Sequence, residues 1–180
     1  MGDERALLER AREYDPAALG EIYDRYSVKI YNYIYRRLGD AHLAEDLTAD
    51  VFVKMLEAIR ASVPWRISFS GWLYRIAHNA VIDYLRRHCE ERELHLNERL
   101  IAAGDSPTIA LEGKLMQQQL RAAISRLNED YQQVIILKFI EGLSNAEVAE
   151  ILGRSEGAVK SLQHRALTSL RHIMQGGERK

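Results

Sequence analysis

Apolar side chains recur every three or four residues through the first half of the chain, which is the spacing of one helix face. The first run covers residues 19–33, and Gly39 with Asp40 is suited to end that helix and open the next. A second run covers residues 44–59 and a third covers 69–88, with a loop containing Pro, Gly and Ser between them. The side chains predicted to face inward are Leu19, Ile22, Tyr23, Tyr26, Ile30 and Tyr33, then Ala44, Leu47, Val51, Met55 and Ile59, then Trp72, Leu73, Ile76, Ala80 and Tyr84.

An acidic stretch interrupts this helical pattern. Residues 89–113 carry a net charge of −4 and contain Gly104, Ser106 and Pro107, which predicts a flexible linker. Helical spacing returns at residues 114–127 and continues through 134–139. The chain has only 3 prolines and few alternating β-branched residues, so the predicted fold class is all-α. Two small helical domains, 1–88 and 114–180, are joined by the acidic linker 89–113.

Residues 143–167 combine the start and stop signals of two short helices. Ser144 with Glu147 forms a capping box, Gly153 allows the first helix to end, and Ser155 can cap the second. The small Ala149 lets the two helices cross closely, as in a helix-turn-helix. The residues predicted to be buried are Val148, Ile151 and Leu152 in the first helix and Val159, Leu162, Ala166 and Leu170 in the second.

The outward face of the second helix is basic. Residues 154–172 carry a net charge of +3, and such a helix suits the major groove of DNA. Arg154, Arg165 and Arg171 are placed to meet phosphates, while Glu156, Lys160 and His164 are placed to reach base edges. The alternative is a helical hairpin whose basic face is simply solvated. The candidate DNA-binding residues are Arg154, Ser155, Glu156, Gly157, Lys160, Ser161, His164 and Arg165.

Composition excludes several other functions. A formal net charge of −1 argues against a protein that coats nucleic acid indiscriminately. Cys89 is the only cysteine, and its neighbours His88 and His95 make at most a weak metal-site signal, so we expect no metal and no cofactor. The charged start is not a secretory signal, and no apolar run is long enough for a membrane span, which predicts a cytoplasmic protein without membrane contact. We find no catalytic constellation and expect no enzyme.

Three segments together resemble the bacterial sigma-70 family. ISRLNEDYQQVIILKFIEGLSNAEVAEILGRSEGAVKSLQHRALTSLR resembles region four, SFSGWLYRIAHNAVIDYLRR the promoter-melting part of region two, and AEDLTADVFVKML its polymerase-binding part. They lie in the family's order, without the further regions of primary sigma factors, which is the layout of the extracytoplasmic-function (group IV) subfamily. Asn128 stands where a proline is frequent, and Leu162 and Gln163 stand where a basic residue is common. These two departures put the promoter sequence preference in doubt.

The resemblance implies a transcription initiation factor. Region four would bind the minus-thirty-five promoter element and the flap of RNA polymerase, and region two would bind the polymerase clamp helices. The acidic linker would thread toward the active-site cleft. Asp46, Asp50 and Glu57 form an acidic ridge that would guide a basic partner, with Phe52 as an exposed anchor beside Val53. On the residues alone, a solvated helix face explains these acids equally well.

Region two would also open the minus-ten element, which requires cations for phosphates and pockets for unstacked bases. Asp83 is expected to pair with Arg87 four residues later. Trp65 could line a pocket for an unstacked base, or it could pack on the helices and hold its loop against them. The candidates are Arg75, His78, Asn79, Arg86 and Arg87 on the third helix, expected opposite Trp72, Ile76 and Tyr84, with Trp65, Arg66 and Ser68 in the loop before it.

Activity of such a factor must be restrained, so we expect an anti-sigma partner that covers the polymerase-binding surfaces of both domains. Two other readings stay open. A stand-alone helix-turn-helix regulator would bind DNA tightly as the isolated chain, and a sigma-mimicking adaptor would usually require a receiver or sensor domain.

Overall fold

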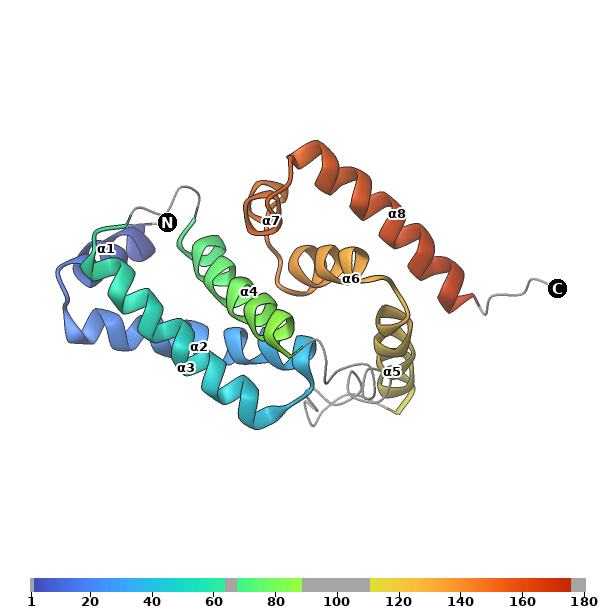
Figure 1. Cartoon of the computed structure of the whole chain (residues 1–180), viewed down its shortest axis with the longest axis horizontal. Helices are drawn as coiled ribbons and strands as arrows, with labels where there is room; N and C mark the ends of the chain where they lie inside the picture. Colours follow the sequence, from blue (N-terminus) through green and yellow to red (C-terminus); the bar gives the residue numbers. More distant parts are fainter. Residues whose placement is uncertain (1, 64–67, 89–110, 176–180) are drawn as a thin grey trace. The chain divides into compact units, whose positions relative to one another are not determined.

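The structure, a computed structural model, describes residues 2–63, 68–88 and 111–175 (Figure 1). The chain divides into two compact units, residues 1–89 and 90–180, and each is described by itself below. All regular elements of the described residues are helical, which confirms the all-α prediction. Most of the acidic linker, residues 89–110, lies outside the described residues, while its last three residues belong to helix α5, which begins at Leu111.

The first unit consists of helices α1 (Gly2–Arg12), α2 (Pro16–Leu38), α3 (Ala41–Arg60) and α4 (Phe69–Arg87). Helix α2 packs against the other three, and α3 also packs against α4 (Figure 1). Local signals set the helix ends: Asp15, Asp40 and Ser68 accept hydrogen bonds as N-caps. Gly39 ends α2 with φ of 70°, a left-handed conformation that glycine adopts without strain.

The core of the first unit is made where α2, α3 and α4 meet. Within it, the Tyr33 ring stands edge-on to Tyr74 at 5.6 Å between centroids. One inward prediction is wrong, since Tyr23 of α2 is half-exposed. Five other residues predicted to face inward are only partly buried: Leu19, Tyr26, Trp72, Ile76 and Tyr84. The fully buried large side chains are Ile22, Ile30, Tyr33, Ile34, Val51, Met55, Leu73 and Val81.

The second unit consists of α5 (Leu111–Ser125), α6 (Glu129–Ile135), the π-helix η3 (Ile136–Ile140), α7 (Asn145–Leu152) and α8 (Glu156–Met174). Asn128 separates α5 from α6, and its side chain accepts a hydrogen bond from the Tyr131 N–H at 2.9 Å. At this position, where a proline is frequent in the family, asparagine therefore provides the N-cap of α6.

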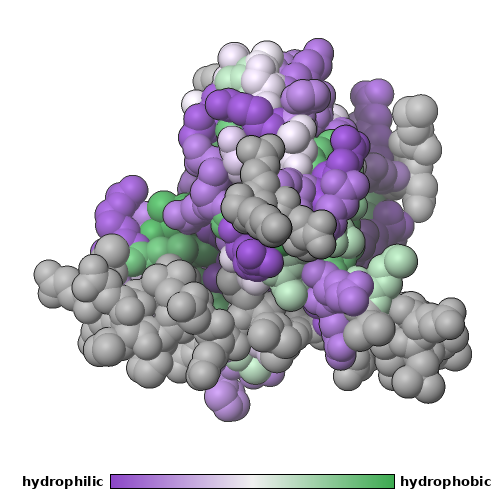
Figure 2. Space-filling view, turned by 90° about the vertical axis from the view of Figure 1, so that its right-hand side faces the viewer, coloured by the Kyte–Doolittle hydropathy of each residue, from purple (hydrophilic) through white to green (hydrophobic). Residues whose placement is uncertain are grey.

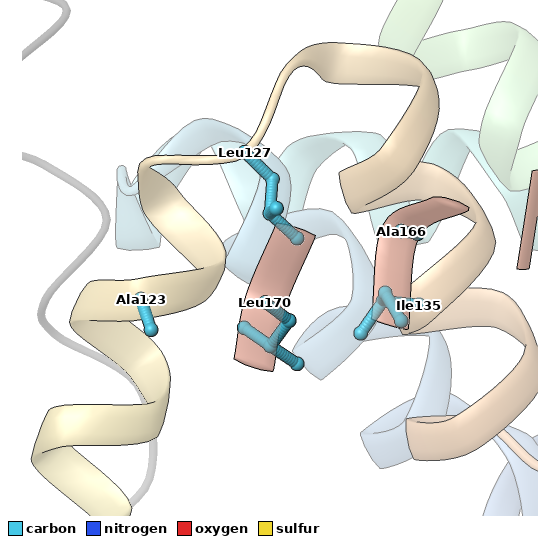
Figure 3. Close-up of a cluster of buried hydrophobic side chains, with 5 residues drawn as sticks. All are labelled: Ala123, Leu127, Ile135, Ala166 and Leu170. Carbon is cyan, nitrogen blue, oxygen red and sulfur yellow. The ribbon is translucent and has the colours of Figure 1, made fainter. Parts of the chain in front are cut away.

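Helix α8 packs against α5 and α6 and also against α7. Its C-terminal half contributes Ala166 and Leu170 to a cluster with Ala123, Leu127 and Ile135, which come from α5, the following turn and α6 (Figure 3). Its N-terminal half packs against α7 through the fully buried Val159. The long helix is therefore held along its length, which fixes the direction of its exposed face.

On the face shown in Figure 2, hydrophilic side chains cover most of the described surface, and hydrophobic side chains show in smaller areas between them. None of the helices in residues 2–63, 68–88 and 111–175 combines the length and the apolarity that crossing a bilayer requires.

Candidate functional site

The helix-turn-helix predicted at residues 143–167 is present with its predicted caps. In the capping box, the Ser144 N–H donates to Glu147 Oε2 at 2.6 Å and the Glu147 N–H donates to Ser144 Oγ at 3.2 Å. Gly153 ends α7 with φ of 62°, and the Ser155 hydroxyl accepts a hydrogen bond from the Ala158 N–H. The capping box thus defines the start of α7, and Gly153 with Ser155 defines the turn between α7 and α8.

Helix α8 has one buried and one exposed side, as predicted. Val159, Leu162, Ala166 and Leu170 are buried, whereas Leu152 at the end of α7 is only partly buried. The candidate DNA-binding residues are exposed: Arg154, Ser155, Glu156, Gly157, Lys160, Ser161, His164 and Arg165, together with Arg171. The guanidinium of Arg154 forms an ion pair with Asp130 at 2.8 Å.

Leu162 and Gln163, where the resemblance led us to expect a basic residue, each have a structural role on α8. Leu162 is buried and belongs to the core. Gln163 donates from Nε2 to Asn145 Oδ1 at 2.7 Å, so it braces α8 against the first residue of α7. The sequence did not reveal this pair, because the two residues lie 18 positions apart.

Helix α3 presents an acidic stripe of four residues: Asp46, Asp50, Val53 and Glu57. Their spacing of four, three and four residues places them on one face, and all four are exposed. The expected anchor Phe52 is not on this face: its side chain is 6% exposed and its ring packs against Tyr23 at 4.8 Å. The prediction that Phe52 is exposed is therefore wrong, because one residue turns a helix by about 100°. Val53, 53% exposed, is the apolar side chain of the stripe.

A hollow of about 480 Å³ adjoins the acidic stripe. It is lined by Tyr14, Val53, Leu56, Glu57 and Arg60. Tyr14 has a φ of 60° and donates from its hydroxyl to the Leu56 carbonyl oxygen at 2.5 Å, which fixes the turn between α1 and α2 over α3. No pattern in the sequence pointed to Tyr14, because its role depends on a contact 42 residues away.

The residue after Tyr14 stabilises the same turn. Asp15 accepts hydrogen bonds from Arg10 Nε at 2.7 Å and from the Ala17 N–H at 2.9 Å. These hydrogen bonds lower the pKa of the Asp15 carboxyl below its ordinary value, and the bond from Arg10 has the larger effect. This carboxylate is therefore ionised at neutral pH and caps α2 in its charged form.

Helix α4 exposes most of the predicted minus-ten candidates. Arg75, Asn79, Arg86 and Arg87 are exposed. His78 is not: it is 7% exposed, and its Nδ1 lies 3.0 Å from the Tyr33 hydroxyl oxygen. The prediction that His78 faces outward is wrong, because a tyrosine of α2 pairs with it in the core.

The aromatic residues of α4 are also placed differently from the prediction. Trp72 and Ile76 are partly buried and lie on the same side of α4 as Arg75 and Asn79, not opposite them. The Trp72 ring packs against Phe69 at 5.5 Å. Arg87 donates from Nε to the backbone carbonyl oxygen of Asp83 at 3.2 Å, so this hydrogen bond joins the Arg87 side chain to the Asp83 backbone.

The loop before α4 is only partly described. Trp65 and Arg66 lie outside the described residues. Ser68 is the N-cap of α4, and its hydroxyl accepts a hydrogen bond from the Gly71 N–H at 2.9 Å. Of the three residues with a weak metal signal, His88 packs on the Tyr84 ring, and Cys89 and His95 lie outside the described residues. The described part of the chain contains no group of three metal-ligating side chains.

The different placements of Phe52 and Val53 predict opposite outcomes for two neighbouring substitutions. Phe52→Ala should lower the free energy of unfolding by about 3 kcal/mol, because it removes a buried aromatic side chain. Val53→Ala should change it by less than about 0.5 kcal/mol, because Val53 is exposed. Urea unfolding of the full chain measures both. Equal losses for the two variants would contradict the placement of Phe52 in the core.

Comparison with known proteins identifies both units. The family description "Sigma-70 region 2" matches residues 22–90, and "Sigma-70, region 4" matches residues 117–170. The ECF RNA polymerase sigma factor BldN of Streptomyces coelicolor is 37% identical over 93% of this chain, which spans 64% of that relative's length. The ECF RNA polymerase sigma factor SigW of Bacillus subtilis is 33% identical, covering 91% of this chain and 92% of SigW.

Solved structures share the fold. CnrH, solved in complex with the cytosolic domain of CnrY, matches with a TM-score of 0.69 and 23% identity, over 97% of this chain and 98% of that chain. The sigma factor RpoE of Bartonella quintana, solved with the anti-sigma factor NepR, matches with a TM-score of 0.71 and 20% identity. The match covers 88% of this chain and 98% of that chain. At these identities the likeness concerns the fold of the chain.

Proposed function

This chain belongs to the extracytoplasmic-function subfamily of the sigma-70 family of RNA polymerase sigma factors, and we propose which of its surfaces meet the polymerase and the promoter. Sigma factors are not enzymes: they direct transcription initiation by binding RNA polymerase core and promoter DNA. We place this activity in the cytoplasm, where bacterial RNA polymerase works. The observation that carries the proposal is an exposed basic recognition helix in one unit together with an exposed acidic stripe in the other.

The acidic stripe of α3 is our candidate for the contact with the polymerase clamp helices. Asp46, Asp50 and Glu57 place three carboxylates on one exposed face, which favours a basic partner and speeds encounter. Val53 lies among them and also lines the hollow beside Tyr14, so it replaces Phe52 as the candidate apolar anchor. Phe52 supports the stripe from within the core by packing against Tyr23.

Helix α4 is our candidate for the minus-ten element. Arg75, Arg86 and Arg87 provide exposed cations for phosphates, and Asn79 provides an exposed amide that can pair with a base edge. Trp72 is partly buried and lies on the same side of α4 as Arg75 and Asn79, so its ring is a candidate for stacking on a base. Trp65 and Arg66 remain candidates for a base pocket, and Ser68 contributes by fixing the start of α4.

Helix α8 is our candidate for the minus-thirty-five element. Its first two turns carry the small residues Gly157 and Ser161, which allow close approach to the groove floor. Lys160 and His164 lie on the exposed face one turn apart and can reach base edges, while Arg154, Arg165 and Arg171 can reach phosphates.

The π-helix η3 offers an apolar surface for the polymerase flap. Phe139 and Ile140 are 52% and 43% exposed, while the preceding Ile136 and Leu137 are buried. Two adjacent exposed hydrophobic side chains of this size favour contact with a protein partner over solvent. The sequence alone placed Phe139 only within a continuing helical pattern, whereas in the structure it is an exposed residue of the π-helix.

We also propose that an anti-sigma factor holds the chain inactive. RpoE of Bartonella quintana was solved with the anti-sigma factor NepR, and on this chain the acidic stripe and η3 would be the surfaces to cover. Co-expression with the product of the neighbouring gene should give a complex in size-exclusion chromatography. Charge reversal of Asp50 should weaken that complex, and a chain that elutes alone beside the neighbouring product would contradict this regulation.

Selection from a random library tests the proposed function directly. Core polymerase with this chain is incubated with DNA in which two blocks, spaced as a minus-thirty-five and a minus-ten element, are randomised. Enrichment of defined sequences in both blocks supports a sigma factor that reads two elements. Enrichment by the chain alone, without polymerase, would instead support a stand-alone helix-turn-helix regulator.

A further inference from the structure

The ion pair between Arg154 and Asp130 connects the turn of the helix-turn-helix to another helix. Arg154 Nη2 donates to Asp130 Oδ2 at 2.8 Å, and the two residues lie 24 positions apart. Asp130 belongs to the first turn of α6, whereas Arg154 directly precedes Ser155, the N-cap of α8. The pair therefore holds a candidate phosphate-binding side chain from outside the helix-turn-helix.

The other cations of the α8 face are held differently. Arg165 Nε donates to the Ser161 carbonyl oxygen at 3.4 Å, within the same helix. Within the part of the chain that the structure describes, Lys160, Arg165 and Arg171 form no ion pair with a carboxylate. Arg154 thus differs from its neighbours in having a carboxylate partner from a separate helix.

The neighbours of Asp130 serve α6 itself. Asn128 caps the helix through the Tyr131 N–H, and Glu129 accepts a hydrogen bond from Gln133 Nε2 at 3.3 Å. Asp130 is the residue of this turn whose carboxylate reaches Arg154. The adjacent acid Glu129 carries the same charge in the same helix turn and therefore provides a matched control.

Both ends of Arg154 are fixed in this arrangement. Its backbone N–H donates to the Ala149 carbonyl oxygen at 2.9 Å, and its guanidinium is held by Asp130. A guanidinium has five N–H donors, so the contact through Nη2 leaves others available for a phosphate. A side chain ordered before binding loses less rotamer freedom when DNA arrives. Exposed ion pairs contribute little to folding stability, so orientation is the main consequence of this pair.

We propose that Asp130 is a positioning residue for minus-thirty-five recognition, which orients the Arg154 guanidinium toward a DNA phosphate at the N-terminal edge of α8. This inference rests on the proposed function of α8. It assigns a role in DNA binding to an acidic residue that lies outside the helix-turn-helix and that would repel phosphates if it acted alone.

A double-mutant cycle tests the proposal in the polymerase holoenzyme. The probe is a promoter selected from the random library, and its affinity is measured for Asp130→Asn, Arg154→Ala and the double variant. Asp130→Asn should weaken promoter binding about two- to five-fold, the range for an exposed ion pair. Glu129→Gln should leave affinity unchanged, and Asp130→Glu should restore most of it. In the Arg154→Ala background, Asp130→Asn should cause no further loss.

Several outcomes would overturn the positioning role. Tighter promoter binding by Asp130→Asn would mean that the carboxylate only repels DNA. An equal loss with and without Arg154 would mean that Asp130 acts through the stability of α6, which thermal unfolding of the variants would show independently. Lys160→Ala separates this inference from the proposed function. If Lys160→Ala weakens promoter binding and Asp130→Asn does not, only the positioning role fails, whereas no loss in either variant refutes α8 as the reader.

Discussion

Reversing the charge of Asp46 and Asp50 together, by Asp46→Lys and Asp50→Lys, is expected to lower the affinity for core RNA polymerase by about 30-fold or more. The loss of one hot-spot residue costs about 2 kcal/mol or more, and we expect these two carboxylates of the exposed α3 stripe together to reach at least that value. A basic partner would then meet two cations instead of two anions. Competition with a fluorescent sigma factor for core polymerase measures the change.

The fold should tolerate this double substitution. Asp46 and Asp50 already form a like-charge pair one turn apart, and the reversal keeps that repulsion with the opposite sign. Glu13→Lys with Asp24→Lys, on exposed acids elsewhere in the first unit, is the matched control and should keep core affinity. Equal affinity of the stripe variant and this control would show that the stripe is only a solvated helix face.

Reversing the charges of Lys160 and Arg165 on α8, by Lys160→Glu and Arg165→Glu, is expected to weaken promoter binding while leaving core polymerase binding intact. Promoter affinity of the holoenzyme should fall about 100-fold, because two DNA contacts of about 1.4 kcal/mol each are lost. The slope of the logarithm of the promoter association constant against the logarithm of salt concentration should become shallower by about two. The reason is that two cations that contact phosphates or bases are lost. Core polymerase binding should be unchanged, because both residues belong to α8 and lie outside the proposed polymerase surfaces on α3 and η3.

The same charge change on exposed cations of the first unit controls for net charge. Arg12→Glu with Lys29→Glu lowers the net charge by the same amount and should leave the promoter affinity close to that of the unmodified chain. If both double variants lose affinity equally, the effect is one of overall charge and α8 has no special role.

Local signals in the sequence predicted the helix-turn-helix well. The capping box of Ser144 and Glu147 and the glycine at 153 act within four residues, so they depend little on the rest of the fold. The buried stripe of α8 follows from helical periodicity alone and is buried as predicted. For the same reason, the bounds of α3 and α4 agree closely with the predicted runs.

The wrong predictions concern residues at the border between a buried and an exposed face. Periodicity places a residue within a sector of the helix, and the packing of other helices then decides whether it is covered. Phe52 is covered by Tyr23 of α2, and His78 is paired with Tyr33, 45 residues away. Trp72 lies on the opposite border and stays partly exposed.

Other features required long-range contacts that no sequence pattern announces. The hollow beside the stripe depends on the Tyr14 hydroxyl reaching Leu56, and the orientation of Arg154 depends on Asp130. The brace between Gln163 and Asn145 explains a family departure that from the sequence was only an anomaly. In each case both partners are ordinary polar or aromatic residues, and their relation appears only when the helices are packed.

Run-off transcription with purified bacterial core polymerase tests the central claim most directly. The template carries the promoter selected from the random library. Core polymerase is supplied with the unmodified chain, with the double variant Asp46→Lys, Asp50→Lys, or with the double variant Lys160→Glu, Arg165→Glu. We expect a specific transcript with the unmodified chain and none with either variant, with core binding lost in the first variant and kept in the second. No specific transcript from the unmodified chain, together with nanomolar binding of the same DNA by the chain without polymerase, would contradict the assignment as a working sigma factor.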